Sequence, residues 1–302
     1  MPKRKSASRA SATLPVIFIM DMDLTMVGYS NHYGSLKELV SFVRDCFKTK
    51  KIENLPCPKA QNYTDLITTE FVRPGLKDMF ANIVKMYPTA EFFVYSAGAK
   101  LYVESLIPAV EKLLGISFNR PLFTRDDCIV NENRGNFKSI MVHYDTMVRS
   151  LSTKYPALKD AANQQQVLKS RIVFVDDVDF VWDLKEKWIK CPEYDYSPVV
   201  DVTKYIETAT RKHPIVAAHI EKNGVFFREP EADTCDERFM AYHMFMAEWY
   251  RMQYKKNKAA LDDTFCTAFV KAITPFKQLA HPFTDANIKK INTQLALTPP
   301  SP

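Results

Sequence analysis

The sequence contains no run that approaches the roughly 18 apolar residues of a membrane-spanning helix. Its first residues, MPKRKSASRASATLP, are basic but lack the apolar stretch of a secretory signal. The six cysteines are scattered, without a CxxC pair and without the spacing of a metal site. These features predict an intracellular protein with reduced thiols and no membrane partner.

The body of the chain also lacks a strong excess of charge. The formal net charge is +6, and four of the positive charges lie in the N-terminal tail, residues 1–14. The remaining balance is too even to predict direct nucleic-acid binding on charge alone. The tail has three open interpretations, namely a nuclear address, an arm that attracts phosphate, or a flexible solvated leader. Location in the nucleus and in the cytoplasm are both compatible with it.

Glycine is scarce, at 7 of 302 residues against 18 prolines, which favours defined elements joined by proline-marked loops. Three short apolar runs stand out: VIFIM at 16–20, EFFVY at 91–95 and RIVFV at 171–175. None alternates with polar residues, so each suits a strand buried on both faces of a parallel sheet. Helical patterns lie between and around them, at 75–87, 99–114 and 138–152. Strands and helices in alternation predict a doubly wound α/β domain over residues 15–200.

Two segments depart from this rhythm. Residues 27–70 carry a lysine cluster and the turn-prone stretch NLPCPKAQN, and we expect an insertion that forms a cap or flap over the site. Beyond residue 200 the alternation of strand and helix patterns is lost. Aromatic and methionine residues between 239 and 249 are spaced as on the packing face of a helix. We therefore expect a mainly helical C-terminal extension over residues 201–302.

Each of the three apolar runs leads into polar residues. In chain order these are Asp21, Asp23 and Thr25, then Ser96, then Asp176 and Asp177. Because the carboxyl ends of parallel strands meet at one edge of a sheet, we expect these side chains to lie together. Crowded carboxylates repel one another unless a cation lies among them, and a hard divalent cation with oxygen ligands fits best.

The order of the acidic residues suggests phosphoryl transfer. Asp21 emerges directly from a strand and can act both as a magnesium ligand and as a nucleophile toward phosphorus. Asp23 can protonate the departing oxygen and then accept a proton from the hydrolytic water. Asp176 would complete the metal site, with Asp177 acting directly or through a water.

Donors to the phosphate oxygens are expected at the same edge. The candidates are Ser96, the main-chain amide of Ala97, the hydroxyl of Thr25, and a lysine that neutralises charge in the transition state. Each motif alone has a plainer interpretation, since aspartates and serines after strands often cap helices or turns. All three motifs in order, each at a strand end, favour the catalytic interpretation.

These motifs resemble those of the haloacid dehalogenase (HAD) superfamily, and within it the phosphatases of the RNA polymerase II C-terminal domain. Four stretches carry the resemblance: EFVRPGLKDMF at 70–80, FFVYSAGAKLYVESLIPAV at 92–110, LFTRDDCIVNENRGNFKSI at 122–140 and VFVDDVDFVWD at 173–183. With the first aspartate motif included, the resemblance covers roughly residues 15–190. The first motif reads DMDLT where that family usually has DLDET, and no BRCT-like module is evident after residue 200.

The resemblance implies a HAD-like fold, Mg²⁺ as the cofactor and an aspartate-based protein phosphatase. By position, Asp21 matches the nucleophile and Asp23 the general acid and base, whose main-chain carbonyl would be a further metal ligand. Ser96 matches the phosphate-binding hydroxyl, and Asp176 matches the metal-binding aspartate. The phosphate-binding lysine is left open among Lys138, Lys159 and Lys169.

Three functions remain open at this point. The first is a magnesium-dependent phosphatase acting on phosphoserine or phosphothreonine in a protein segment, with the RNA polymerase II tail as one candidate. Exposed aromatics could hold such a segment, for example Tyr29, Tyr33 and Tyr102. The second is a phosphatase for a small molecule or a nucleic-acid end, which a tight cap would favour. The third is a binding protein that keeps the fold without turnover.

Overall fold

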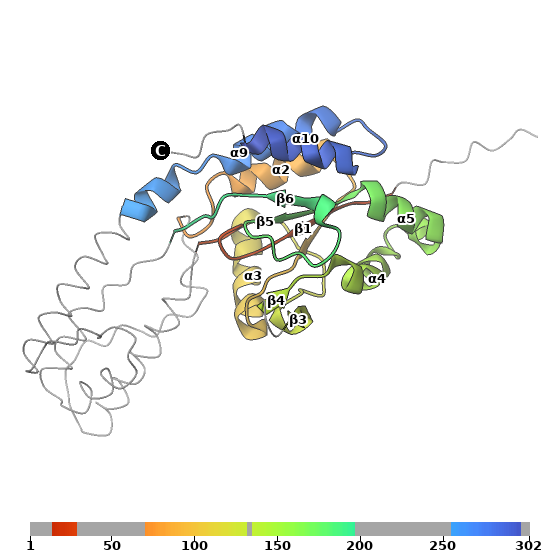
Figure 1. Ribbon diagram of the computed structural model, residues 1–302, viewed down its shortest axis with the longest axis horizontal. Coiled ribbons are helices and arrows are strands. Elements are labelled where there is room, and N and C mark those ends of the chain that lie inside the picture. The colour runs from red at the N-terminus through yellow and green to blue at the C-terminus, as the bar shows by residue number, and fades with distance from the viewer. Residues whose placement is uncertain (1–13, 29–69, 132–134, 197–254, 297–302) are drawn as a thin grey trace, which may run out of the picture.

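The computed structural model describes residues 14–28, 70–131, 135–196 and 255–296 (Figure 1). Within these residues, four strands form one sheet in the order β2-β1-β5-β6, and every neighbouring pair is parallel. The strands are β1 (Val16–Met20), β2 (Ala90–Val94), β5 (Ile172–Asp176) and β6 (Trp188–Lys190). The predicted α/β fold class is confirmed, and the three predicted strands lie within one residue of their expected positions.

The central strand β1 is buried on both faces, which explains why its sequence does not alternate. Phe18 and Met20 belong to one hydrophobic cluster, and Ile17 and Ile19 belong to a second cluster on the other face. In the sheet register, Phe18 lies opposite Phe92 on β2. The sheet therefore lies between two hydrophobic cores, and the polar residues that follow its strands lie at its edge.

Three helices predicted from the sequence are present. They are α2 (Leu76–Met86), α3 (Lys100–Leu114) and α4 (Ile140–Leu151). Gly75 precedes α2 with a φ of 73°, and Gly115 follows α3 with a φ of 69°, a left-handed conformation that glycine adopts without strain. The side chain of Ser139 caps α4 by accepting a hydrogen bond from the amide of Val142 at 3.2 Å.

Other elements were not expected from the sequence. The helix α5 (Ala161–Ser170) leads into β5, and β3 (Ile129–Asn131) pairs with β4 (Gly135–Phe137) in a separate antiparallel ribbon. The described residues also include the short 3₁₀ turns η2 (Arg125–Asp127), η3 (Pro156–Lys159), η4 (Lys185–Lys187) and η5 (Thr274–Phe276), and residues 255–261 are helical.

The C-terminal helices α9 (Phe265–Ile273) and α10 (Asp285–Ala296) pack with the sheet. Figure 1 shows both beside α2 on one side of the sheet, with α4 on the other. Phe283, between them, meets the ring of Phe18 edge-on at a centroid distance of 5.4 Å. The described part of the expected C-terminal extension is helical and belongs to the same hydrophobic core as β1 and β2.

The expected cap or flap falls mostly on residues 29–69, outside the described ranges, as do the N-terminal tail to residue 13 and the stripe at 239–249. Among the residues that are described, no helix combines the length and the apolar character needed to cross a membrane.

Candidate active site

The first acidic motif lies in a tight turn after β1. Asp21 is buried, and its amide donates to the carbonyl of Val175 on the neighbouring strand at 3.0 Å. The amides of Met26 and Val27 both donate to the carbonyl of Met22, which closes the turn. Leu24 at its tip has a φ of 59°, a left-handed conformation that costs a branched residue about 1 to 2 kcal/mol. The surrounding hydrogen bonds hold the loop in this shape.

Three carboxylates from two adjacent strands meet at this edge. Oxygen atoms of Asp21, Asp176 and Asp177 all lie within 4.8 Å of one another, and all three residues are buried. Burial, followed by repulsion from Asp21, raises the pKa of Asp176 to about 7 and that of Asp177 to about 6. Ligands at about 2.1 Å from one ion stand at most about 4.2 Å apart, so a small rearrangement lets these oxygens share one Mg²⁺. The donor set therefore fits a hard divalent cation.

Lys138 is the lysine that the fold brings to this cluster. Its buried ammonium group donates to Asp21 and, at 2.7 Å, to Asp176. Burial alone would lower the pKa of Lys138, but the two carboxylates outweigh it and raise the pKa above its ordinary value. The main chain of Lys138 is held between Phe180, whose carbonyl accepts its amide at 2.7 Å, and Trp182, whose amide donates to its carbonyl at 2.8 Å.

The two alternative lysines lie elsewhere. Lys159 ends η3 and is exposed, and Lys169 is exposed on α5, which precedes the amino end of β5. The acidic cluster forms at the carboxyl end of the same strand. The structure therefore favours Lys138 over the other two as the cation of the site.

Asp23 has a partner that the sequence did not indicate. The hydroxyl of Tyr102, on the first turn of α3, donates to a carboxylate oxygen of Asp23 at 2.6 Å. Burial raises the pKa of Asp23 to about 7, the hydrogen bond from Tyr102 opposes that rise, and repulsion from Asp21 adds to it. A carboxyl group with such a pKa can both give and take a proton near neutral pH. Tyr102, expected as a possible peptide contact, instead holds this carboxyl group.

The hydroxyl of Thr25 forms hydrogen bonds with Asp177. It donates to the Asp177 carboxylate at 3.1 Å and lies 3.2 Å from the Asp177 amide, which donates to it. Thr25 is buried, so its geometry suits orienting Asp177 more directly than the phosphate contact predicted from the sequence.

Ser96 and Ala97 follow β2 at the turn into α3. The Ser96 hydroxyl oxygen accepts a hydrogen bond from the Gly98 amide at 2.9 Å, which leaves its own hydrogen to donate. A Cβ atom at Gly98 would lie 3.1 Å from that oxygen, so the turn is closely packed. The carbonyl of Ala97 accepts from the side chain of Arg125 at 2.8 Å. Ser96 and Ala97 therefore lie in a hydrogen-bonded turn directly after β2, and their contact with phosphate stays a prediction.

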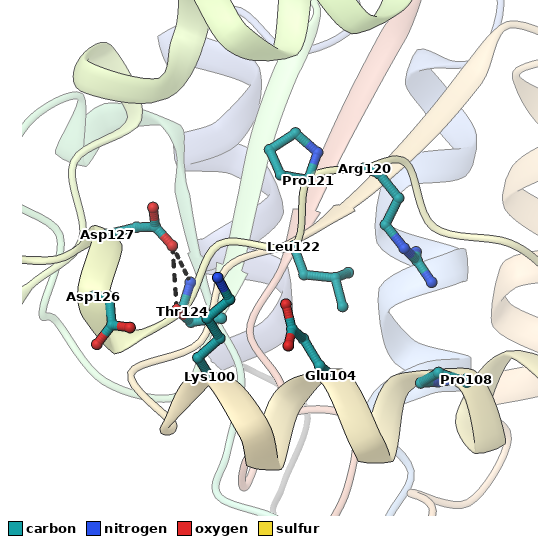
Figure 2. A pocket seen from close by; sticks show the side chains of 9 residues that line it. All are labelled: Lys100, Glu104, Pro108, Arg120, Pro121, Leu122, Thr124, Asp126 and Asp127. Carbon is teal, nitrogen blue, oxygen red and sulfur yellow. Dashed lines mark hydrogen bonds between the residues drawn. The ribbon is translucent and has the colours of Figure 1, made fainter.

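A cavity of about 430 Å³ lies beside this turn, between α3 and residues 120–127 (Figure 2). Lys100 and Glu104 project into it from the helix, and Leu122 and Asp126 line it from the opposite segment. The three carboxylates of the cluster and Lys138 are not among its lining residues. The cavity is therefore a neighbour of the candidate active site and not its centre.

A comparison with known protein families shows which family this chain belongs to. The family model described as NLI interacting factor-like phosphatase matches residues 16–209, nearly two thirds of the chain. The chain belongs to this family. The match includes every residue of the acidic cluster, Lys138, Ser96 and Tyr102. The resemblance to phosphatases of the HAD type is thereby confirmed, and general phosphatase activity follows from membership.

Solved structures that are similar to the chain include the following two. The first, "The Structure of Fcp1, an essential RNA polymerase II CTD phosphatase", is 15% identical, with a TM-score of 0.31 over 91% of this chain and 68% of that one. The second, a variant of the fission yeast RNA polymerase II CTD phosphatase Fcp1 bound to beryllium fluoride, is 14% identical, with a TM-score of 0.29 over 82% and 67%. No curated protein matches the chain.

Proposed function

We propose that this member of the family is a magnesium-dependent phosphatase that hydrolyses phosphoserine or phosphothreonine in a protein substrate, through a phospho-aspartyl intermediate on Asp21. The observation that carries the proposal is the convergence of Asp21, Asp176 and Asp177 within 4.8 Å, with the ammonium group of Lys138 bound to two of them.

The carboxylates of Asp21, Asp176 and Asp177 would hold Mg²⁺, with the main-chain carbonyl of Asp23 as a further predicted ligand. When bound, the ion supplies positive charge that neutralises the phosphoryl oxygens as they approach the carboxylates. The ammonium group of Lys138 contributes a second positive charge on the same side. Thr25 keeps the Asp177 carboxylate aimed at the cluster through its hydroxyl.

The reaction takes two displacements at phosphorus. In the first, a carboxylate oxygen of Asp21 forms a bond to phosphorus, the ester P–O bond breaks, and the departing alkoxide takes a proton from Asp23. In the second, Asp23 accepts a proton from water as the water oxygen bonds to phosphorus, and inorganic phosphate leaves Asp21. Tyr102 holds the Asp23 side chain in both steps by its 2.6 Å hydrogen bond.

Exposed aromatic side chains support a protein substrate. Phe180 and Trp182 are 45% and 51% exposed, and they flank the main chain of Lys138. The ring of Phe137 meets both, at centroid distances of 5.9 Å and 5.5 Å. Neighbouring exposed apolar groups at the rim of a site suit the side chains that flank a phosphorylated residue. The names of the similar structures make a tail of the RNA polymerase II type the first substrate to try.

The test is Mg²⁺-dependent hydrolysis of a phosphoserine peptide by the wild-type chain and by Asp21→Asn. We expect turnover that requires Mg²⁺ and is lost in the variant, while the matched control Asp145→Asn, an exposed aspartate on α4, keeps full activity. Equal turnover by Asp21→Asn would exclude the nucleophile assignment. A higher kcat/KM for a nucleotide or a 3′-phosphorylated DNA end than for any phosphopeptide would favour the small-substrate alternative. Absence of any turnover with Mg²⁺ would favour a silent binding protein.

A further inference from the structure

Arg73 is a fully buried cation next to the catalytic loop. Its guanidinium group donates to the carbonyl of Thr25 at 2.8 Å and also to the carbonyl of Pro192. The group lies over two aromatic rings, 5.6 Å from the centroid of Tyr194 and 4.9 Å from that of Phe265. One side chain therefore joins the loop that carries Asp23 and Thr25 to two other segments.

The main chain around Arg73 is attached to the same loop. The Arg73 amide donates to the carbonyl of Met26 at 2.9 Å, and the Gly28 amide donates to the carbonyl of Phe71 at 2.8 Å. Val27 and Val72 form an isolated β-bridge between these contacts. A displacement of Arg73 is thus transmitted to the loop through the side chain and through the backbone.

The counter-charge of Arg73 comes from Asp263, 190 residues away in the sequence. The Asp263 carboxylate lies 3.2 Å from Nε and 3.3 Å from Nη2 of Arg73, and it is largely buried. Asp263 also accepts a hydrogen bond from the amide of Phe265 at 3.0 Å, at the start of α9. The family match ends at residue 209, so this carboxylate lies outside the matched segment. A buried guanidinium group without its carboxylate would be strongly disfavoured.

We propose that Asp263 is a positioning residue for phosphoryl transfer: it fixes Arg73, which in turn fixes the carbonyl of Thr25 and thereby the loop that presents Asp23. This proposal rests on the function proposed above. It makes the start of α9 a part of the active-site scaffold, acting on the reacting groups through Arg73 and Thr25.

The chain offers a second buried cation whose ion pair lacks this connection, although its carboxylate, on Asp285, is 66% exposed. Lys187 is buried and donates to the carbonyl of Lys169 at 2.6 Å and to the carboxylate of Asp285 at the start of α10. This pair also joins a C-terminal helix to the body of the protein. Its bonded partners are the carbonyls of Lys169 and Phe283 and the carboxylate of Asp285, none of which belongs to the catalytic loop.

A change of leaving group separates positioning from stability. Asp23 must protonate the alkoxide of phosphoserine, whereas p-nitrophenolate leaves with little assistance. Hydrolysis of the aspartyl phosphate, which also uses Asp23, is common to both substrates and affects kcat for both, whereas kcat/KM reports only the steps through departure of the leaving group. A misplaced Asp23 therefore lowers kcat/KM selectively for the peptide, and a loss of folded protein lowers kcat/KM equally for both substrates. The experiment measures kcat and KM for a phosphoserine peptide and for p-nitrophenyl phosphate, with Mg²⁺, in full-length wild type, Asp263→Asn, Asp263→Glu, Arg73→Lys and Asp285→Asn.

We expect kcat/KM for the peptide to fall about tenfold more than kcat/KM for p-nitrophenyl phosphate in Asp263→Asn, since a displacement of about 1 Å costs up to about a hundredfold in rate. Asp263→Glu should recover most of the loss. Arg73→Lys keeps the charge, but a lysine cannot reach the same acceptors, so this variant should show the same selective loss. It keeps the proposal testable should Asp263→Asn fail to fold.

Asp285→Asn should leave the ratio of the two kcat/KM values unchanged. An unchanged ratio in both Asp263→Asn and Arg73→Lys, with an active wild type, would overturn this proposal alone. An inactive wild type, or an Asp21→Asn variant as active as wild type, would overturn the proposed function instead.

Discussion

The ammonium group of Lys138 lies 2.7 Å from the carboxylate of Asp176, although 38 residues separate them in the sequence. Both side chains are buried at the carboxyl edge of the parallel sheet. A lysine in this place balances carboxylates that would otherwise repel one another, and it stands where a phosphoryl group would gather negative charge. This pairing links the stability of the site to its chemistry.

Replacing Lys138 with methionine should reduce kcat for a phosphopeptide by about a hundredfold to a thousandfold, because it removes a preorganised charge from the transition state. It should also lower the free energy of unfolding by about 3 kcal/mol without Mg²⁺, since buried carboxylates lose their partner. Steady-state kinetics and urea denaturation measure the two effects. Lys169→Met serves as the control and should change neither, because that lysine is exposed on α5. A loss of activity in Lys169→Met with none in Lys138→Met would show that Lys138 is not the phosphate-binding lysine.

Mg²⁺ should stabilise the folded chain through the three carboxylates. At a hundred times its dissociation constant, an ion that binds only the folded state adds about 2.7 kcal/mol to the free energy of unfolding. Thermal unfolding with and without Mg²⁺ measures this shift independently of activity. Asp176→Asn should abolish most of it, and Asp145→Asn should leave it intact. A full shift in Asp176→Asn would place the ion at another site.

Tyr102→Phe removes one oxygen atom and with it the hydrogen bond to Asp23. We expect kcat for the phosphoserine peptide to fall about 5- to 20-fold, the equivalent of about 1 to 2 kcal/mol. KM should change little, because the hydroxyl is committed to Asp23. The matched control is Tyr144→Phe, since the hydroxyl of Tyr144 donates to the carbonyl of Gln164 on α5. A wild-type kcat for Tyr102→Phe would remove Tyr102 from the mechanism.

Phe283→Ala tests whether the C-terminal helices belong to the core. Phe283 is fully buried between the rings of Phe18 and Tyr87, so we expect a loss of about 3 to 5 kcal/mol in the free energy of unfolding. Urea denaturation of the full chain measures it. Leu279→Ala is the control, because Leu279 is 49% exposed and should contribute about 0.5 kcal/mol or less. A loss below about 1 kcal/mol for Phe283→Ala would mean that α9 and α10 dock only loosely.

Much of this architecture is predictable from the sequence, because local patterns record it. The strands β1, β2 and β5 are short apolar runs buried on both faces, and the helices α2, α3 and α4 carry apolar residues at helical spacing. By contrast, β6 is only Trp188–Lys190, too short for any period to show. The helix α5 is rich in glutamine and alanine and buries only three residues, so its apolar face is weak.

The acidic cluster is predictable for the same reason, since parallel strands deliver their following residues to one edge. The partners of those residues are not. The bond from Tyr102 to Asp23 depends on the rotation of α3 about its axis, and the pair of Arg73 and Asp263 joins segments 190 residues apart. No local pattern records such contacts. They follow from how the helices pack against the sheet.

Chemical trapping of the intermediate tests the central claim most directly. The chain is incubated with a phosphoserine peptide and Mg²⁺, quenched in acid and reduced with borohydride, which converts an aspartyl phosphate to homoserine. Peptide mass spectrometry then locates the modified position. We expect homoserine at position 21 in the wild type and none in Asp21→Asn. Turnover of the peptide by the wild type with homoserine at another aspartate, or with none at all, would contradict the account.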